Sequence, residues 1–262
     1  MISVNGKTAL VTGASSGIGK ELTTIHAEHG GNLVIVARDR DALMKLKNEL
    51  EARYSVDVQV IVKDLSLPSA AYEIYEEVKG YGRPIDFLIN NAGFGGIGKF
   101  HEREWKKDLA MINVNVIALT ALTRFFLPDL VSRNSGKILN VSSSAALTPG
   151  PMQAVYYATK AYVTSFGNAV SEELHATDVS ITTLMPGATE SKFAKVSGMD
   201  KTGAFKKALS ARKVAEAGYN GMLKGKLNVT VLPLGQKVAT AVMPFIPKKM
   251  ILRMIRKMQE VE

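Results

Sequence analysis

Residues 12–19 read Thr-Gly-Ala-Ser-Ser-Gly-Ile-Gly and join an apolar run, Thr8–Thr12, to a helical pattern that begins near Lys20. Glycine permits positive φ and a close approach of the backbone to a ligand. The first turn of a helix adds free N–H groups and a partial positive charge. This order is typical of a phosphate-binding turn. The spacing differs from the common G-x-G-x-x-G form, so the turn alone leaves a packing role equally open.

Short β-branched runs alternate with helix-length amphipathic segments on either side of this turn. We expect strands at Thr8–Thr12, Leu33–Ala37, Val56–Val62, Phe87–Asn90, Lys137–Ser142 and Val179–Met185, with a weaker strand at Leu227–Leu232. Parallel strands need crossover connections, and these are usually helices. The alternation therefore predicts an α/β fold, a doubly wound parallel sheet with helices on both faces.

Composition excludes several classes of protein. The chain has 262 residues and no cysteine, so neither disulfides nor thiolate-bound metals are available, and no metal site is expected. A signal-peptide pattern and an uncharged apolar run of about 18 residues are both lacking, so we expect a cytoplasmic protein that does not span a membrane. Residues 224–262 contribute +6 of the net charge of +9, without a motif for nucleic-acid binding.

Further motifs follow the glycine turn in a fixed order: a polar turn after the fourth expected strand, one residue on the next helix, and three residues beyond the fifth strand. They are residues 90–93 (Asn-Asn-Ala-Gly), Asn115, Ser143, Tyr156 and Lys160. With these motifs the chain resembles the classical short-chain dehydrogenase/reductase family over roughly residues 5–233. The resemblance implies an NAD(P)-dependent oxidoreductase that forms homodimers or homotetramers.

The resemblance also implies a single-domain, Rossmann-like architecture. No fixed-period repeat or linker divides the chain. We assign residues 1–233 to one dinucleotide-binding and catalytic domain, in which residues 187–212 form a substrate lid. Residues 234–262 form a basic amphipathic C-terminal tail.

Cofactor contacts are expected in the glycine turn, after the second, third, fourth and sixth strands, and in the catalytic pair. By resemblance they are Gly13, Ser15, Ser16, Gly17, Ile18, Gly19, Arg38, Asp64, Leu65, Asn91, Ala92, Gly93, Tyr156, Lys160, Pro186, Gly187, Thr189 and Ser191. Thr189 and Ser191 remain alternatives for the contact with the nicotinamide carboxamide, and either suits the N-cap of a lid helix. Asp64 taken alone also suits a turn.

The end of the second strand indicates the preferred cofactor. NAD-dependent relatives carry an acidic residue at the position of Ala37, which Arg38 follows here. A carboxylate would repel a 2′-phosphate, whereas a guanidinium can bind it through two hydrogen bonds. We therefore expect NADP(H) in preference to NAD(H). Asp39 competes with this interpretation, because it lies about 20 residues after the turn, where a ribose-binding acid is common. Alternatively, Asp39 starts the next helix.

Tyr156 and Lys160 lie four residues apart in a helical pattern, so their side chains project from one face. A nearby ammonium favours the ionised form of a tyrosine, whose ordinary pKa is about 10. The resemblance implies that Tyr156 is the general acid and that Lys160 lowers its pKa and holds the ribose. It further implies that Ser143 polarises the substrate carbonyl and that Asn115 holds a water. The neighbouring alternatives are Tyr157, Ser142, Ser144 and Asn113.

The expected substrate region is apolar. It comprises Ala145–Val155 and the lid, with Leu147, Pro149, Pro151, Met152, Phe193 and Phe205. These residues indicate a lipophilic ketone or aldehyde that is reduced, or the corresponding alcohol oxidised in reverse; 3-oxoacyl, steroid-like and xenobiotic carbonyls remain open. The alternative function is that of a non-catalytic, dinucleotide-binding regulatory protein.

Pro244 and Pro247 divide the tail. Beyond Pro247, apolar residues fall at helical spacing opposite basic ones. Such a segment suits an anionic membrane surface, a protein partner, a cap over the substrate entrance, or packing on its own domain.

Overall fold

A computed structural model describes residues 3–199 and 208–259. Its seven strands form one parallel sheet in the order β3-β2-β1-β4-β5-β6-β7. The strands are β1 (Thr8–Thr12), β2 (Asn32–Ala37), β3 (Val58–Val62), β4 (Phe87–Asn90), β5 (Gly136–Val141), β6 (Val179–Pro186) and β7 (Asn228–Val231). The strand order reverses between β1 and β4, which is the topological switch point of a doubly wound sheet. The predicted fold class is confirmed, and every strand end lies within two residues of its predicted position.

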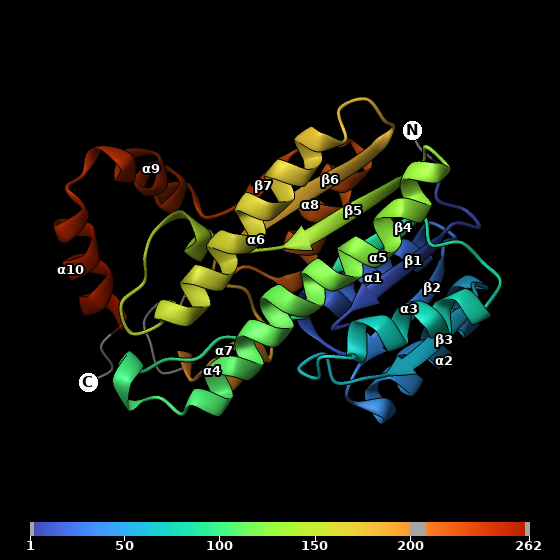
Figure 1. The fold of residues 1–262 in the computed structure, drawn as a ribbon, viewed down its shortest axis with the longest axis horizontal. Coiled ribbons are helices and arrows are strands. Elements are labelled where there is room, and N and C mark those ends of the chain that lie inside the picture. The colour runs from blue at the N-terminus through green and yellow to red at the C-terminus, as the bar shows by residue number, and fades with distance from the viewer. Residues whose placement is uncertain (1–2, 200–207, 260–262) are drawn as a thin grey trace.

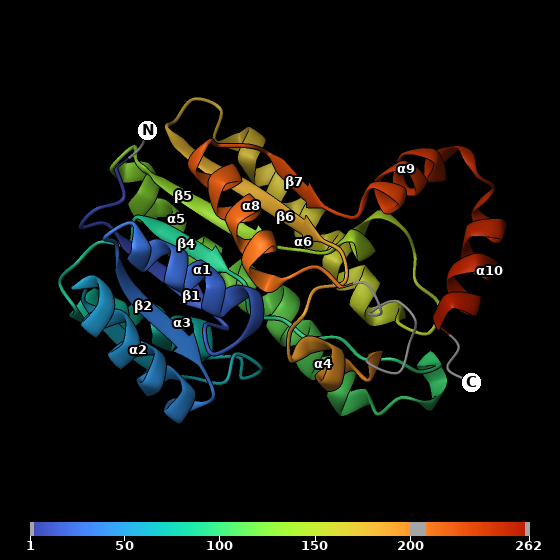
Figure 2. The ribbon, with the colours of Figure 1, turned by 180° about the vertical axis from the view of Figure 1, so that it is seen from behind.

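Helices cover both faces of this sheet (Figures 1 and 2). One face carries α1 (Gly17–Glu28), α2 (Arg40–Tyr54) and α8 (Ala211–Leu223). The other carries α3 (Ala70–Gly80), α4 (Trp105–Ile112), α5 (Leu119–Ser132) and α6 (Ala154–Glu173). Beyond the carboxyl ends of the strands lie α7 (Phe193–Ser197), α9 (Leu234–Val242) and α10 (Lys248–Gln259). The first helix begins at Gly17, three residues before the predicted start, because the glycine turn already supplies its first residues.

The central strands bury both of their faces, which explains their nearly continuous apolar sequences. Side chains alternate across a strand. Ala9 and Val11 of β1 therefore join the core beneath α1, α2 and α8, whereas Leu10 joins the core beneath α3 and α5. Two hydrophobic layers hold the sheet rigid, and the carboxyl ends of its strands provide a fixed platform for a site.

The run Trp105–Ser132 is one continuous helical stretch. Within the described ranges it is long and apolar enough to cross a membrane by length and composition alone, although no such helix was expected from the sequence. Core helices of water-soluble domains pass the same test. This stretch packs against α3 and α6 within the helical layer on the sheet.

A buried histidine couples the stability of the fold to pH. His26 of α1 is fully buried, its Nδ1 lies 2.8 Å from the Tyr219 hydroxyl, and its Nε2 lies 3.1 Å from the Lys7 carbonyl oxygen. Burial lowers the pKa of His26 to about 4. In the unfolded chain the ordinary value is about 6.5, so between pH 6.5 and 4 the unfolded state binds more protons. Stability contributed by the neutral ring is therefore lost as the pH falls through this window.

We expect the free energy of unfolding, measured by urea titration, to fall by about 2 kcal/mol between pH 7.5 and pH 5 because of His26. The control is His26→Gln, since glutamine keeps hydrogen-bonding capacity without a titratable ring. The variant should show a smaller loss over the same pH interval. An equal loss in both proteins would contradict the assignment.

Candidate active site

One large pocket, about 800 Å³ in volume, lies at the carboxyl ends of the strands. All of the predicted cofactor-contact residues line it except Gly19, and so do the predicted catalytic residues Ser143, Tyr156 and Lys160. Asn115 lies behind the pocket wall and is buried. Residues far apart in the sequence thus meet in one cavity, at the switch point where doubly wound folds bind ligands.

The glycine turn forms one end of this pocket. Gly13 and Gly17 have positive φ values of 67° and 55°, and a Cβ on Gly17 would lie 2.8 Å from the Cβ of Ser191. A Cβ on Gly19 would collide with the Gly13 carbonyl oxygen and the Asn91 side chain. Gly19 is thus outside the pocket and allows the turn to pack on its own helix.

The polar turn after β4 braces this loop. The backbone N–H groups of Asn91 and Ala92 each donate to Thr12 Oγ1 at 3.0 Å, and Asn91 Nδ2 donates to the Thr12 carbonyl oxygen at 2.8 Å. Asn91 is therefore occupied in holding the glycine turn against β4, while its neighbour Gly93 lies in the pocket wall.

The turn leaves the start of α1 open to an anion. The side chain of the N-cap residue Ser16 makes no capping hydrogen bond, and the first turn of α1 holds no acidic residue. Ser15, Gly17 and Ile18 face the same pocket. Free N–H groups and the helix dipole favour a phosphate at such a position, so these residues fit the pyrophosphate of a dinucleotide.

Asp39 and Asp64 both have local structural roles at the next part of the pocket. Asp39 Oδ1 accepts a hydrogen bond from Ala42 N at 3.0 Å and thereby caps α2. Asp64 Oδ1 accepts from Ser66 N at 2.9 Å. Hydrogen bonding to Ser66 is the main cause that lowers the pKa of Asp64, and the positive charge of Arg38 adds to it. Arg38 is exposed in the pocket wall.

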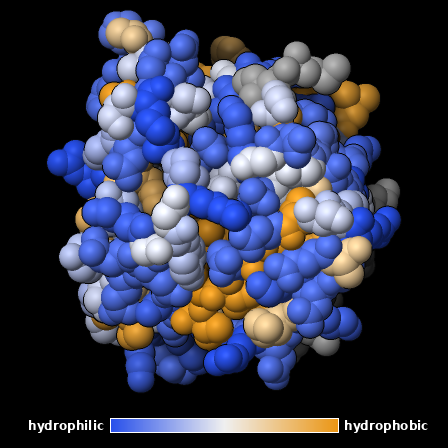
Figure 3. All heavy atoms as spheres, turned by 90° about the vertical axis from the view of Figure 1, so that its right-hand side faces the viewer, coloured by the Kyte–Doolittle hydropathy of each residue, from blue (hydrophilic) through white to orange (hydrophobic). Residues whose placement is uncertain are grey.

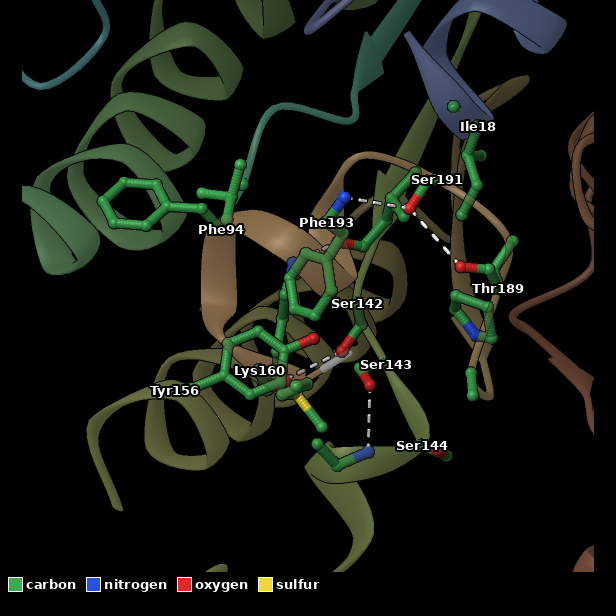
Figure 4. A pocket seen from close by; sticks show the side chains of 18 of the residues that line it. Ile18, Phe94, Ser142, Ser143, Ser144, Tyr156, Lys160, Thr189, Ser191 and Phe193 are labelled. Carbon is green, nitrogen blue, oxygen red and sulfur yellow. Dashed lines mark hydrogen bonds between the residues drawn. The ribbon is translucent and has the colours of Figure 1, made fainter. Parts of the chain in front are cut away.

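Tyr156 and Lys160 are both buried on α6 and project into the pocket (Figure 4). Lys160 Nζ donates to the Val141 carbonyl oxygen at 2.8 Å. Ser142 Oγ donates to the Lys160 carbonyl oxygen at 2.9 Å, so the end of β5 and the helix are held together. Ser142, Ser143 and Ser144 all line the pocket, and it is the hydroxyl of Ser143 that acts on Tyr156. Ser143 Oγ also accepts a hydrogen bond from Ala145 N at 3.1 Å. Ser142, one of the alternatives, thus holds the backbone.

Burial controls the ionisation of this pair. It raises the pKa of Tyr156 to about 12, against a hydrogen bond with Ser143 that acts to lower it. Burial also lowers the pKa of Lys160 to about 8. The sequence predicts that Lys160 lowers the pKa of Tyr156, whereas burial of the phenol acts in the opposite direction and is the largest influence on it. Tyr156 is therefore a protonated phenol at neutral pH.

Asn115 lies in a π-helical stretch, Asn113–Ala118, between α4 and α5. Its Nδ2 donates to the Phe94 carbonyl oxygen and to Thr159 Oγ1, both at 3.0 Å, and its Oδ1 accepts from Phe94 N at 3.1 Å. A Cβ on Gly93 would lie 3.0 Å from Asn115 Oδ1 and 3.2 Å from Lys160 Nζ. Asn115 and Lys160 thus face each other across Gly93. Such π-helical widening is frequent at functional sites.

Asn113, the alternative to Asn115, donates instead to the Ser66 carbonyl oxygen at 3.0 Å. After β6, Thr189 Oγ1 donates to the Gly187 carbonyl oxygen at 2.9 Å. Ser191 Oγ accepts from Phe193 N at 3.2 Å, at the start of the short helix α7 (Figure 4). Both hydroxyls line the pocket and have backbone partners.

The substrate end of the pocket is lined by segments that lie far apart in the sequence. Of the expected apolar residues, Leu147 and Phe193 line the pocket, and Phe205 lies outside the described residues. A cap over the substrate entrance was one of the alternatives for the tail, and α10 does line the pocket, through Met254, Ile255, Met258 and Gln259. The amphipathic period of the tail was visible in the sequence, but nothing there identified the surface on which it packs.

A chain of hydrogen-bonded side chains fixes α10 beside the catalytic helix. Gln153 Nε2 donates to Gln259 Oε1 at 2.6 Å, and Gln259 Nε2 donates to the Tyr157 hydroxyl at 2.8 Å. Tyr157, the neighbour of Tyr156, thus holds the C-terminal helix in place.

The sequence pattern of the family described as short chain dehydrogenase matches residues 7–202. The very-long-chain 3-oxoacyl-CoA reductase of Homo sapiens is 31% identical over 201 residues, which cover 73% of this chain and 62% of that protein. The NADP-dependent 3-hydroxy acid dehydrogenase of Schizosaccharomyces pombe is 35% identical over 198 residues, covering 75% of this chain and 76% of the other.

A solved short-chain dehydrogenase from Sphingobium yanoikuyae, in complex with NADPH, superposes with a TM-score of 0.81 at 27% identity. The superposition covers 92% of this chain and 97% of that one. The matched region spans only about 62% of the length of the human relative.

Proposed function

This chain belongs to the short-chain dehydrogenase family, and on that premise we propose that it reduces a lipophilic ketone or aldehyde with NADPH, or oxidises the corresponding alcohol with NADP⁺. One observation carries the proposal. A single pocket joins the open N-terminus of α1 to the buried Tyr156, Lys160 and Ser143. A dinucleotide site and a proton donor therefore share one cavity.

The protein's own groups supply the proton. When bound, the nicotinamide cofactor supplies or accepts the hydride. The phenol of Tyr156 is protonated at neutral pH, because burial raises its pKa to about 12, and it donates this proton to the substrate oxygen during reduction. The Ser143 hydroxyl orients and polarises that oxygen. Lys160 stabilises the phenolate that remains, because an adjacent cation favours the charged form.

Asn115 completes this group from behind the pocket wall. Its carboxamide bonds to both the N–H and the carbonyl of Phe94, and it faces Lys160 across Gly93. We propose that it positions a water that returns a proton to Tyr156 through Lys160.

The preference for NADP(H) is supported at the end of β2. Arg38 and Asp39 both line the pocket, but Asp39 Oδ1 caps α2 through Ala42 N, whereas the Arg38 guanidinium makes no such helix cap. A 2′-phosphate would meet a guanidinium rather than a free carboxylate.

A lipophilic substrate is supported by the side chains that surround Tyr156. Phe193 packs against its ring with centroids 5.4 Å apart, and Phe94, Met254 and Met258 line the same cavity. Both curated relatives described above are named for oxidoreduction of 3-oxo or 3-hydroxy compounds, so such compounds belong in an assay panel.

The test is a panel of 3-oxoacyl thioesters, steroid ketones and aromatic aldehydes, assayed with NADPH and NADH side by side. We expect NADPH oxidation with at least one apolar carbonyl compound. Tight NADPH binding without turnover across the panel would favour the alternative, a dinucleotide-binding regulatory protein.

The pH dependence of reduction follows from Lys160. Because its pKa is lowered to about 8, its charge is present below pH 8 and is lost as the pH rises through that value. Tyr156, with a pKa of about 12, keeps its proton over this range. We expect kcat/KM for reduction to fall above about pH 8 as one group deprotonates, measured from pH 6 to 10 at saturating NADPH. The dissociation constant of NADPH, followed by fluorescence, separates binding from chemistry. A flat profile up to pH 10 would refute this assignment.

We also propose a homo-oligomer. Trp105, Leu109, Ile117 and Tyr162 are exposed along the helical stretch that begins with α4 and along α6. Pairing these helices between copies would bury apolar surface that otherwise faces water.

A further inference from the structure

The C-terminal segment has an unusual charge distribution. Between Glu216 and Glu260 the sequence has no acidic residue and eight basic ones. Three of them, Lys249, Arg253 and Lys257, follow one another at four-residue spacing on α10, so they share one side of the helix. Within the described ranges, no carboxylate forms an ion pair with Lys248, Lys249 or Arg253. Their charge is available to a partner.

Apolar side chains are exposed on α9 and on the connection from α9 to α10. On α9, Leu234, Val238 and Val242 fall at four-residue spacing and are all exposed, Leu234 to 79%. Phe245, between α9 and α10, is 86% exposed. Figures 1 and 2 show that α9 and α10 form an arm beyond the carboxyl ends of the strands. The opposite end of the molecule presents a mostly hydrophilic surface (Figure 3).

The arm has a fixed orientation. Ile251 and Ile255 are buried on the inner side of α10, and Gln259 bonds to Tyr157. The packing alternative for the tail therefore accounts for the inner side of α10. In the described part of the chain it does not account for the exposed side chains of α9, for Phe245, or for Lys248, Lys249 and Arg253.

The pocket opens along this arm. Met254 and Met258 line the cavity and are also exposed at the surface, and Ala239 and Met243 of the neighbouring segment line it too. A molecule that covered the arm would therefore lie against the mouth of the pocket.

The charge of this surface distinguishes between two binding partners, a second copy of the chain and a lipid surface. A second copy of the chain docked through the same face would bring Lys248, Lys249 and Arg253 against their own equivalents, and like charges repel. An anionic lipid surface complements these cations, and exposed aliphatic and aromatic side chains beside Lys and Arg are typical of helices that lie in the membrane interface.

We propose that α9, Phe245 and α10 form a surface that docks on an anionic lipid bilayer and turns the pocket mouth toward it. Phe245 and Leu234 enter the headgroup region, and Lys248, Lys249 and Arg253 bind lipid phosphates and carboxylates. A lipophilic carbonyl compound then passes from the bilayer to Tyr156 without crossing water. This last step rests on the proposed function, whereas the docking does not.

The test is co-sedimentation of the full chain with vesicles of phosphatidylcholine alone or with 30% phosphatidylserine. The wild type should bind the anionic vesicles and dissociate from them at 1 M salt, because the Debye length falls to about 3 Å and the charges are screened. Each removed cation costs about fivefold in affinity, so Lys248→Gln/Lys249→Gln/Arg253→Gln should weaken binding roughly 100-fold. Phe245→Ser should weaken it about tenfold.

The matched control is Lys45→Gln/Arg53→Gln/Lys79→Gln, which removes three exposed cations from α2 and α3. It should bind like the wild type, and thermal melts verify that all variants fold. Equal loss in both triple variants, or no preference of the wild type for anionic vesicles, would overturn the proposal. A dimer that Phe245→Ser dissociates in analytical ultracentrifugation, without vesicle binding, would assign the surface to a second copy instead. The assay needs no turnover, so its failure is distinct from failure of the proposed reaction.

Discussion

Tyr156→Phe should lower kcat for carbonyl reduction by about 10²–10⁴-fold, because it removes the proton donor from the reaction while leaving the ring in place. The phenyl ring still packs against Phe193, and Tyr157 still holds α10, so the pocket keeps its shape. Stopped-flow or steady-state assays with the best substrate from the panel measure the loss. The dissociation constant of NADPH should change by less than about threefold.

The adjacent tyrosine provides the control. Tyr157→Phe removes a hydroxyl of the same kind one residue away, but that hydroxyl accepts a hydrogen bond from Gln259. Its loss should loosen α10, raise KM for large substrates and lower kcat far less than Tyr156→Phe does. Equal losses of kcat in the two variants would show that pocket shape, rather than proton donation, carries the effect.

The fold was predictable because each strand carries its own signal. β1 is a five-residue apolar run ending in a glycine turn, and the boundaries found are those expected from the sequence. The start of α1 was misplaced, since helix propensity disfavours Gly17 and Gly19 although both lie within the helix. Here the tertiary requirement for close packing on Gly13 and Asn91 overrides local preference.

The sequence was sufficient to predict which residues form the site, but not their ionisation or their partners. Spacing brought Ser143, Tyr156 and Lys160 together, but their ionisation depends on burial, which spacing does not reveal. The contact of Gln259 with Tyr157 joins residues 102 positions apart. A single amide at the end of an amphipathic helix gives no signal of its partner, because many surfaces satisfy the same hydrogen bonds.

Ala37→Asp combined with Arg38→Gln should shift the ratio of kcat/KM for NADPH to that for NADH toward NADH by about 100-fold or more. Loss of hydrogen bonds from a charged group costs roughly 1.5–3 kcal/mol, about a 10- to 100-fold change. A carboxylate at position 37 adds repulsion of the 2′-phosphate and can accept hydrogen bonds from an unmodified ribose. Initial rates with each cofactor, at a fixed saturating carbonyl substrate, give the ratio.

A substitution of Asp39 distinguishes two interpretations, selection of the cofactor by Arg38 and binding of the adenosine ribose by Asp39. Its carboxylate caps α2 through Ala42 N, and asparagine is an equally good N-cap. Asp39→Asn should therefore preserve both the stability of the fold and the cofactor preference. If Asp39 instead held the adenosine ribose, the same change would weaken NADH more than NADPH, because the charge that repels the 2′-phosphate would be gone. An unchanged preference in the Ala37/Arg38 variant, together with a shift in Asp39→Asn, would reassign cofactor selection from Arg38 to Asp39.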